Sequence, residues 1–165
     1  MEYRLRELRI DDAASIAKYA NNRNVSKFLT DAFPYPYTLE NGLDFIVRSA
    51  ENENALILAI EINGEVSGCI GVHLQSDIHR KNAELGYWLA EKYWGNGIVT
   101  EAVTQIVDQA FNKFDINRIF ARPFNTNPGS KRVLEKAGFK LEGRFEKTLI
   151  KDGEYLDELI YAIRK

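Results

Sequence analysis

The chain has 165 residues, a formal net charge of −2 and a sequence pI of about 5.8. No basic excess points to a nucleic-acid partner, and no apolar run approaches the roughly 20 residues that cross a bilayer. A single cysteine, Cys69, excludes an internal disulfide and fits a reducing cytoplasm. We therefore expect one cytoplasmic domain spanning residues 1–165, because this length suits a single hydrophobic core.

The first part of the chain predicts a strand followed by two helices. Residues 3–9 alternate charged and apolar side chains, and Asp11 can cap a helix that runs to about residue 22. The segment TDAFPYPYT, residues 30–38, is too rich in proline and aromatic residues for regular structure. Thr38 can then cap a second helix, whose apolar residues recur at helical spacing.

A run of strands follows, and then a long helix. The apolar segments 55–62 and 65–75 flank Asn63-Gly64, the strongest short-range hairpin signal. NAELGYWLA, residues 82–90, predicts a fourth strand. After the glycines near residue 96, apolar residues recur at the helical period: Ile98, Ala102, Ile106, Ala110 and Phe114.

The last third predicts a strand, a short helix and a hairpin. NRIFARPF is a fifth strand, after which Asn127 can cap a helix with Pro128 at its first position and Gly138 beyond its end. Two further strands surround Asp152-Gly153. The order β-α-α-β-β-β-α-β-α-β-β indicates an α+β protein with a mixed sheet of about seven strands and about four helices.

The stretch EKYWGNGIVTEA, residues 91–102, places Gly95 and Gly97 just ahead of the long helix. A phosphate-binding P-loop fails, because Ile98-Val99 stands where lysine and Ser or Thr are needed. A dinucleotide fingerprint is weak, because Thr100 replaces its third glycine. Two interpretations of the glycines remain possible. They can form a simple turn, or they can form an anion site, since the helix start presents unpaired N–H groups and the positive end of its dipole.

The stretch AELGYWLAEKYWGNGIVTEA, followed about 25 residues later by NPGSKRVLEKAGF, resembles the Gcn5-related N-acetyltransferases (GNAT), in particular their Rim-type branch. The element order matches that fold across nearly the whole chain. The resemblance implies acetyl-CoA as co-substrate, bound at its pyrophosphate by backbone amides of a glycine-rich loop. That loop maps onto six positions here: Trp94, Gly95, Asn96, Gly97, Ile98 and Val99. Thr100 carries the next amide.

Two loop positions depart from the family pattern. Trp94 stands in place of Gln or Arg, a change that looks typical of the Rim branch. Val99 stands in place of a small residue, and the methyl groups of Val99 could crowd a phosphate. The amides do not depend on these side chains, so cofactor binding is still expected. The resemblance also implies that pantetheine lies along the fourth strand, against Tyr87, Trp88 and Leu89, with the amide of Leu89 or Ala90 at the thioester oxygen. Asn127 corresponds to a family residue that contacts the cofactor, although it can equally be an ordinary helix cap.

An amine attacks a thioester only as the free base, so a general base or a water chain is expected. Glu84 resembles the base of histone-type relatives, and alternation places it with Gly86 and Trp88 on one face of the strand. Many relatives protonate the thiolate with a tyrosine where this chain has Leu134, and Rim-type enzymes suggest Ser130 instead. Glu84 could equally be a surface carboxylate, and Ser130 a simple first-turn serine.

Other polar residues are weaker candidates for a functional site. Cys69 and His73 lie four residues apart, roughly 13 Å along a strand, too far for a nucleophilic pair. Two histidines and one cysteine give no metal-site spacing, so no metal is expected. Asp157 could meet a substrate amine or pair across strands.

The acceptor is the least specified partner. The resemblance places AFPYPY over the acceptor, where Phe33, Tyr35 and Tyr37 could hold a peptide N-terminus or a small amine, or pack under a lid. We expect direct acetyl transfer to a primary amine of a protein N-terminus or small molecule, with a homodimer left open. The alternative is a non-catalytic coenzyme A-binding sensor or interaction module.

Overall fold

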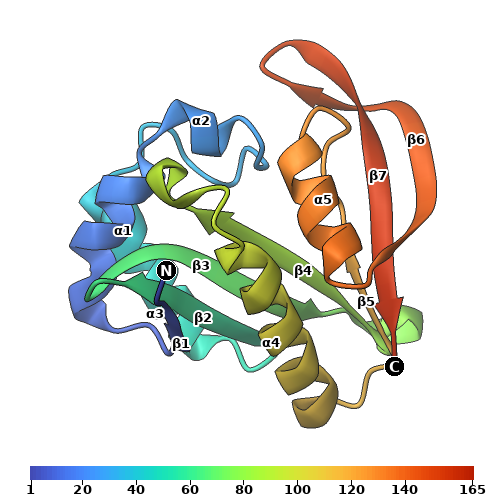
Figure 1. Cartoon of the computed structure of the whole chain (residues 1–165), viewed down its shortest axis with the longest axis horizontal. Helices are drawn as coiled ribbons and strands as arrows, with labels where there is room; N and C mark the ends of the chain where they lie inside the picture. Colours follow the sequence, from blue (N-terminus) through green and yellow to red (C-terminus); the bar gives the residue numbers. More distant parts are fainter.

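A computed structural model describes all of residues 1–165. Its centre is one seven-stranded sheet with the order β1-β2-β3-β4-β5-β7-β6, shown in Figure 1. Neighbouring strands are antiparallel except for β4 and β5, which are parallel. The strands are β1 (Arg4–Arg6), β2 (Ala55–Ile62), β3 (Glu65–Leu74), β4 (Asn82–Leu89), β5 (Arg118–Ala121), β6 (Lys140–Lys151) and β7 (Glu154–Arg164).

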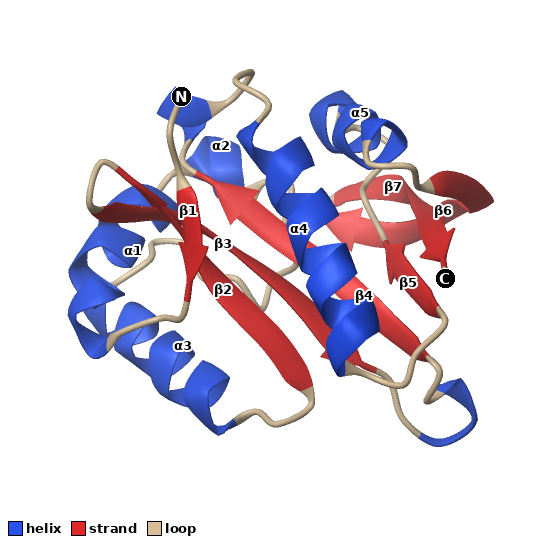
Figure 2. Ribbon diagram, turned by 60° about the horizontal axis from the view of Figure 1, so that its bottom comes forward, coloured by secondary structure: helices blue, strands red, loops and turns tan.

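Helices cover both faces of this sheet (Figure 2). They are α1 (Ala13–Ala20), α2 (Arg23–Ser26), α3 (Leu39–Glu51), α4 (Ile98–Lys113) and α5 (Pro128–Lys136). One buried cluster joins α4 and α5 to one face of the sheet, and a second joins α1 and α3 to the other. None of the helices combines the length and the apolar character that a membrane crossing needs.

The predicted element order is confirmed, with one addition. Helix α2 is a single turn between α1 and α3, and four residues carry no detectable periodicity. The first strand is shorter than residues 3–9, because only Arg4–Arg6 pairs with β2. Asp11 does not cap α1, since a 3₁₀ turn at Ile10–Asp12 precedes the helix.

The other predicted turns and caps are confirmed by the backbone. Asn63 and Gly64 both have positive φ, 53° and 82°, as a two-residue hairpin turn requires. The Thr38 hydroxyl accepts from the Asn41 N–H at 3.1 Å and starts α3. The Asn127 side chain accepts from the Ser130 N–H at 3.1 Å and starts α5.

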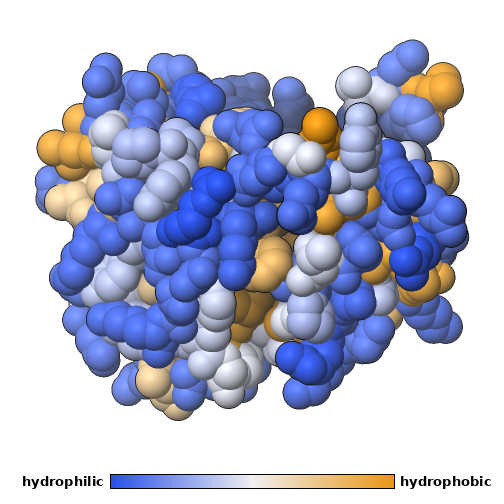
Figure 3. Space-filling model, turned by 90° about the horizontal axis from the view of Figure 1, so that it is seen from above, coloured by the Kyte–Doolittle hydropathy of each residue, from blue (hydrophilic) through white to orange (hydrophobic).

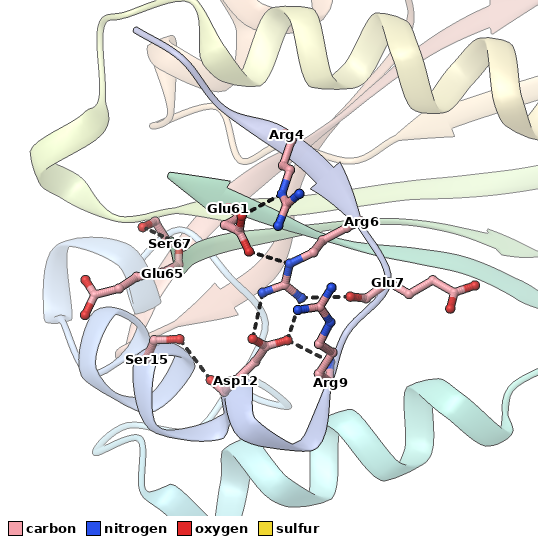
Figure 4. A network of polar contacts seen from close by, with 9 residues as sticks. All are labelled: Arg4, Arg6, Glu7, Arg9, Asp12, Ser15, Glu61, Glu65 and Ser67. Atoms are coloured by element: carbon pink, nitrogen blue, oxygen red, sulfur yellow. Dashed lines mark hydrogen bonds and ion pairs between the residues drawn. The ribbon is translucent and has the colours of Figure 1, made fainter. Parts of the chain in front are cut away.

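A network of charged side chains fastens the edge of the sheet to the start of α1 (Figure 4). The Arg6 guanidinium binds Glu61 on β2 at 2.5 Å and both carboxylate oxygens of Asp12 at 2.8 and 2.9 Å. Arg4 binds the other oxygen of Glu61 at 2.6 Å. Because β1 pairs over only three residues, these ion pairs supply much of what holds it in place.

Candidate active site

The sheet opens between β4 and β5. The two strands pair only where Asn82–Glu84 faces Arg118–Phe120, and beyond that point they diverge (Figure 1). Strand β4 continues to Leu89, so residues 85–89 have no strand partner on the β5 side. The opening therefore exposes one edge of a strand inside the sheet.

The register of β3 and β4 shows which backbone groups line this opening. At the two ends of the pair, Gln75 N–H donates to Asn82 O at 2.9 Å and Ala90 N–H donates to Ser67 O at 2.7 Å. No bulge interrupts the pairing between them, so even-numbered residues of β4 bond to β3. The N–H and C=O groups of Tyr87 and the N–H group of Leu89 therefore point into the opening.

The register of β4 shows which of two backbone amides, that of Leu89 or that of Ala90, is free to bind the thioester oxygen. The Ala90 N–H already donates to the Ser67 carbonyl, so it is not free to bind a thioester oxygen. The Leu89 N–H points into the opening and is the remaining candidate. For Trp88, the backbone faces β3 and the side chain is buried on the α1 and α3 face, so its contribution is packing.

The glycine-rich loop begins where β4 ends, after the 3₁₀ turn Glu91–Tyr93. Gly95 and Gly97 have φ of 78° and 77°, a conformation that strongly favours glycine. The Trp94 N–H donates to Glu91 O and the Glu101 N–H donates to Gly97 O. No backbone N–H from Gly95 to Thr100 donates to another group of the chain. Six successive donors thus stand free at the positive end of α4.

Side chains of the loop hold its shape from outside. The Trp94 indole N–H donates to the Leu89 carbonyl at 2.8 Å, which ties the loop to the end of β4. The Asn96 side chain donates to the carbonyls of Tyr93 and Trp94 at 3.0 and 3.2 Å. The side chain of Ile98 is buried in the core, so only its backbone can meet a ligand. Trp94 therefore has a structural task that needs neither Gln nor Arg.

Helix α5 brings Ser130 to β4. The Ser130 hydroxyl lies 2.5 Å from the Tyr87 hydroxyl, and the Asn127 cap fixes the backbone of the same turn. Burial raises the pKa of Tyr87 to about 12, and the hydrogen bond with Ser130 opposes this shift. Tyr87 thus keeps its proton at neutral pH. The half-buried Ser130 remains within reach of the opening.

Glu84 lies on the other face of β4. Its carboxylate binds the Arg122 guanidinium through two hydrogen bonds of 3.0 and 3.1 Å, and His73 stands opposite it on β3. Desolvation lowers the pKa of His73, while the charge of Glu84 opposes the shift. Alternation along β4 separates Glu84 from the Tyr87 and Ser130 hydroxyls, so the two candidate catalytic groups flank the strand without touching.

Other polar candidates serve the fold. Burial raises the pKa of the Cys69 thiol, and Cys69 packs in the second core cluster. Asp157 binds Arg144 at 2.5 Å and accepts from the Lys147 N–H at 2.9 Å, which makes it a hairpin residue. No group of three or more His, Cys, Asp or Glu side chains has a metal-binding arrangement.

Aromatic residues of the segment before α3 gather beside Trp88. The rings of Phe33 and Tyr37 lie 5.1 Å apart, and Phe33 meets Trp88 edge-on at 5.8 Å. Tyr37 is buried, and burial raises its pKa to about 12. Tyr35 is half exposed, with the Arg23 guanidinium 5.4 Å from its ring centroid. Only Tyr35 of the three presents much of its ring to solvent.

The β6–β7 hairpin reaches across to the same region. Asp152 at its turn binds Arg23 at 2.9 Å, and Lys151 binds Asp31 at 2.9 Å. Figure 3 views the molecule from this side and shows a mostly hydrophilic surface with a hollow near the centre, where apolar residues are visible. The hairpin and the α2 segment therefore bridge over one end of the site.

Two functional candidates were not apparent from the sequence. Arg122 follows β5, and only the parallel register of β4 and β5 brings it to Glu84. The Tyr87 hydroxyl meets Ser130 only because α5 packs against β4, 43 residues along the chain. Its position on the same strand face as Leu85 and Leu89 was a usable signal, since that face meets the helices that follow.

Residues 3–140 match a protein family described as "Acetyltransferase (GNAT) domain". Over 101 residues the chain is 35% identical to the Bacillus subtilis N-acetyltransferase YoaA, covering 61% of this chain and 56% of that protein. It is 32% identical over 82 residues to the Escherichia coli ribosomal-protein-serine acetyltransferase, covering 50% and 46%. With the E. coli L-amino acid N-acetyltransferase AaaT it shares 25% identity over 116 residues, covering 70% and 72%. The chain thus spans about half the length of two of these relatives.

Solved structures agree over almost the whole chain. The Microcin C7 self-immunity acetyltransferase MccE, in complex with acetyl-CoA and AMP, has a TM-score of 0.86 at 26% identity, covering 99% of this chain and 93% of that one. Mycobacterium smegmatis RimJ, in complex with a CoA disulfide, has a TM-score of 0.86 at 26% identity, covering 98% and 81%.

Proposed function

The chain belongs to the GNAT acetyltransferase family, and from this premise we propose that it is an acetyl-CoA-dependent N-acetyltransferase whose acceptor is an α-amino group. The acceptor would be a free amino acid or the N-terminus of a peptide or protein. The amine attacks the acetyl thioester directly, without an acyl-enzyme, because the only cysteine is buried in the core.

The observation that carries the cofactor site is the run of six free N–H groups from Gly95 to Thr100. Free donors at a helix start suit a pyrophosphate, which brings negative charge to the positive end of the α4 dipole. The same opening exposes the N–H and C=O groups of Tyr87 and the N–H group of Leu89, which suit the amides of an extended pantetheine chain. A Cβ at Gly95 or Gly97 would meet nothing within 4 Å, so the chain leaves space there for a ligand.

Acetyl-CoA supplies an activated acetyl thioester. In the proposed arrangement the Leu89 N–H hydrogen-bonds the thioester oxygen, which stabilises negative charge developing there. Glu84 takes a proton from the acceptor amine, with Arg122 holding its carboxylate in place. The Ser130 hydroxyl hydrogen-bonds the sulfur of the departing coenzyme A from the other face of β4. These roles are supported by the free amide of Leu89 and by the separation of the two polar groups across the strand.

The acceptor class rests on the relatives together with the shape of the site. A ribosomal-protein-serine acetyltransferase and an L-amino acid N-acetyltransferase, both similar to this chain, share an α-amine as the group their names imply. In this chain Phe33 packs against Trp88, whose side chain is on the same face of β4 as Glu84. Aromatic rings and a carboxylate on one strand face fit a protonated amine next to a small side chain.

The test compares amines at equal concentration by release of free thiol from acetyl-CoA. The panel contains serine and alanine, short peptides with a free N-terminal serine, the same peptides N-formylated but carrying a lysine, a polyamine and an amino sugar. We expect turnover with the α-amines only. Faster turnover of the polyamine, the amino sugar or the lysine side chain would overturn the acceptor class.

A further inference from the structure

Tyr87 carries a hydroxyl that the reaction, as described so far, does not use. It comes from the middle of β4, and its only hydrogen-bond partner in the chain is Ser130 at 2.5 Å. The place where many relatives carry a tyrosine is occupied by Leu134, which is fully buried in the core. The phenol that meets the first turn of α5 therefore comes from β4 and not from the helix.

Both members of the pair are held from two directions. Ser130 is in the first turn of α5, where the Asn127 side chain accepts its N–H at 3.1 Å and Pro128 occupies the first helical position. Tyr87 is fixed by its strand, and its ring packs against the core cluster under α4 and α5. The hydroxyl pair thus bridges β4 and α5 at the opening between β4 and β5.

The direction of the hydrogen bond decides what the pair can do. A phenol is a stronger acid than an alkyl alcohol and is therefore the better donor of the two. When Tyr87 donates to the Ser130 oxygen, the serine proton has no partner in the chain and can turn toward the opening. Donation in a chain also strengthens the second hydrogen bond, because each bond polarises the next.

From this geometry we propose that Tyr87 is a positioning residue that orients the Ser130 hydroxyl as a hydrogen-bond donor to the sulfur of the departing coenzyme A thiolate. The inference rests on the proposed function, because it assigns the sulfur to this part of the site. No proton leaves the pair during the reaction. A thiol ordinarily has a pKa near ~8.5, whereas burial raises that of Tyr87 to about 12, so the thiolate is too weak a base to deprotonate either hydroxyl.

A binding measurement tests the pair without any acceptor. Coenzyme A is bound to the protein and its thiol is titrated through the ultraviolet absorbance of the thiolate. A hydrogen bond that stabilises the thiolate lowers the pKa of the bound thiol. We expect this lowering in the wild type, its loss in Ser130→Ala and its reduction in Tyr87→Phe. A titration curve that is identical in wild type and Tyr87→Phe would overturn the proposal.

Kinetics supply the second arm. Ser130→Ala should slow kcat by about 10²-fold or more, and Tyr87→Phe by roughly tenfold, with little change in acetyl-CoA affinity. If Tyr87 acts through Ser130, the double variant should be no slower than Ser130→Ala alone. Multiplying effects in the double variant would mean that Tyr87 acts independently of Ser130, which contradicts the proposal.

Tyr161→Phe is the matched control. Its hydroxyl also bonds a residue of α5, Glu135, at 3.0 Å, and it is buried in the same core cluster. Its removal should leave both kcat and the thiol titration unchanged. If the wild type acetylates no α-amine, the proposed acceptor is wrong, while the thiol titration still decides whether Tyr87 and Ser130 serve the sulfur.

Discussion

Gly97 combines a left-handed backbone with open space at the start of α4. Gly97→Val places a branched side chain where the pyrophosphate is proposed to lie. We expect coenzyme A affinity to fall at least tenfold, about 1.4 kcal/mol, by calorimetry. Strain alone is controlled by Gly64→Val, since Gly64 has a φ of 82° in a hairpin turn and also meets nothing within 4 Å. Equal coenzyme A affinity in the two folded variants would mean that the glycine-rich loop does not bind coenzyme A.

Glu84→Gln keeps the shape of the side chain and removes its basicity. If Glu84 takes the amine proton, kcat should be low at neutral pH and recover as the pH approaches the pKa of the acceptor amine. If Glu84 only binds a cationic acceptor, KM should rise while kcat stays near normal. Glu142→Gln is the control, because Glu142 also binds an arginine, Arg118, at 2.9 Å and lies outside the site. Unchanged kinetics in Glu84→Gln would mean that Glu84 has only a structural role.

The role of a residue could be predicted where its sequence neighbours determine it. Contacts between residues far apart in the chain could not be predicted. The Asn127 cap, the Gly97 conformation and the burial of Cys69 each follow from a few neighbouring positions. The ion pair of Glu84 with Arg122 depends on where β5 meets β4, 38 residues further along the chain. The Tyr87 contact with Ser130 likewise depends on how α5 packs, which a single sequence does not specify.

Among the elements, β1 depends most on a single side chain. Arg6 joins Glu61 on β2 to Asp12 ahead of α1, and all three side chains are largely buried. Arg6→Met should lower the free energy of unfolding by roughly 2 kcal/mol, because it leaves Asp12 without its guanidinium partner. Lys18→Met removes the exposed ion pair with Glu65, which water screens, and should cost clearly less than Arg6→Met. Urea unfolding measures both, and equal losses would contradict the assignment.

The same network predicts how stability changes with acid. Burial of Asp12 acts to raise its pKa, but hydrogen bonds from Arg6 and from the Arg9 N–H outweigh burial and lower it. Hydrogen bonds from Arg4 and Arg6 lower the pKa of Glu61. Both groups therefore stabilise the fold fully above their unfolded pKa values of 3.8 and 4.5, and this contribution is lost as the pH falls through the folded values. The loss should be shallower in Arg6→Met.

The elements that carry strong local signals were predicted closely. The turns at Asn63-Gly64 and Asp152-Gly153 and the helix from residue 98 all appear where expected. Helix α2 was missed because one turn has no period to detect. The first strand was overextended because alternation continues past Arg6, while pairing with β2 ends there.

At the scale of the whole molecule, the opening divides the sheet into two parts joined by few strand contacts. β4 and β5 share only three paired positions, whereas β3 and β4 share seven. A ligand that binds the free edge of β4 would join the parts, so coenzyme A should raise the stability of the protein. At a hundredfold excess over Kd we expect about 2.7 kcal/mol, seen as a rise in Tm.

Hydrogen exchange locates this stabilisation. Coenzyme A should slow exchange at the amides of Tyr87, Leu89 and residues 95–100, while the β2 and β3 amides that pair with one another exchange as before. Dephospho-coenzyme A, which keeps the pyrophosphate, should protect the same amides. A rise in Tm without protection of these amides would place the ligand elsewhere.

The cradle of free N–H groups also has a consequence for how this protein can change over generations. Its donors belong to the main chain, and every amino acid except proline supplies the same N–H. Substitutions at Val99 or Thr100 can therefore accumulate while the proposed anchor for the common donor persists. In the proposed site the acceptor would instead meet side chains such as the exposed Tyr35, whose chemistry changes with each substitution. One scaffold can thus pass through many acceptors in evolution without ever losing its donor.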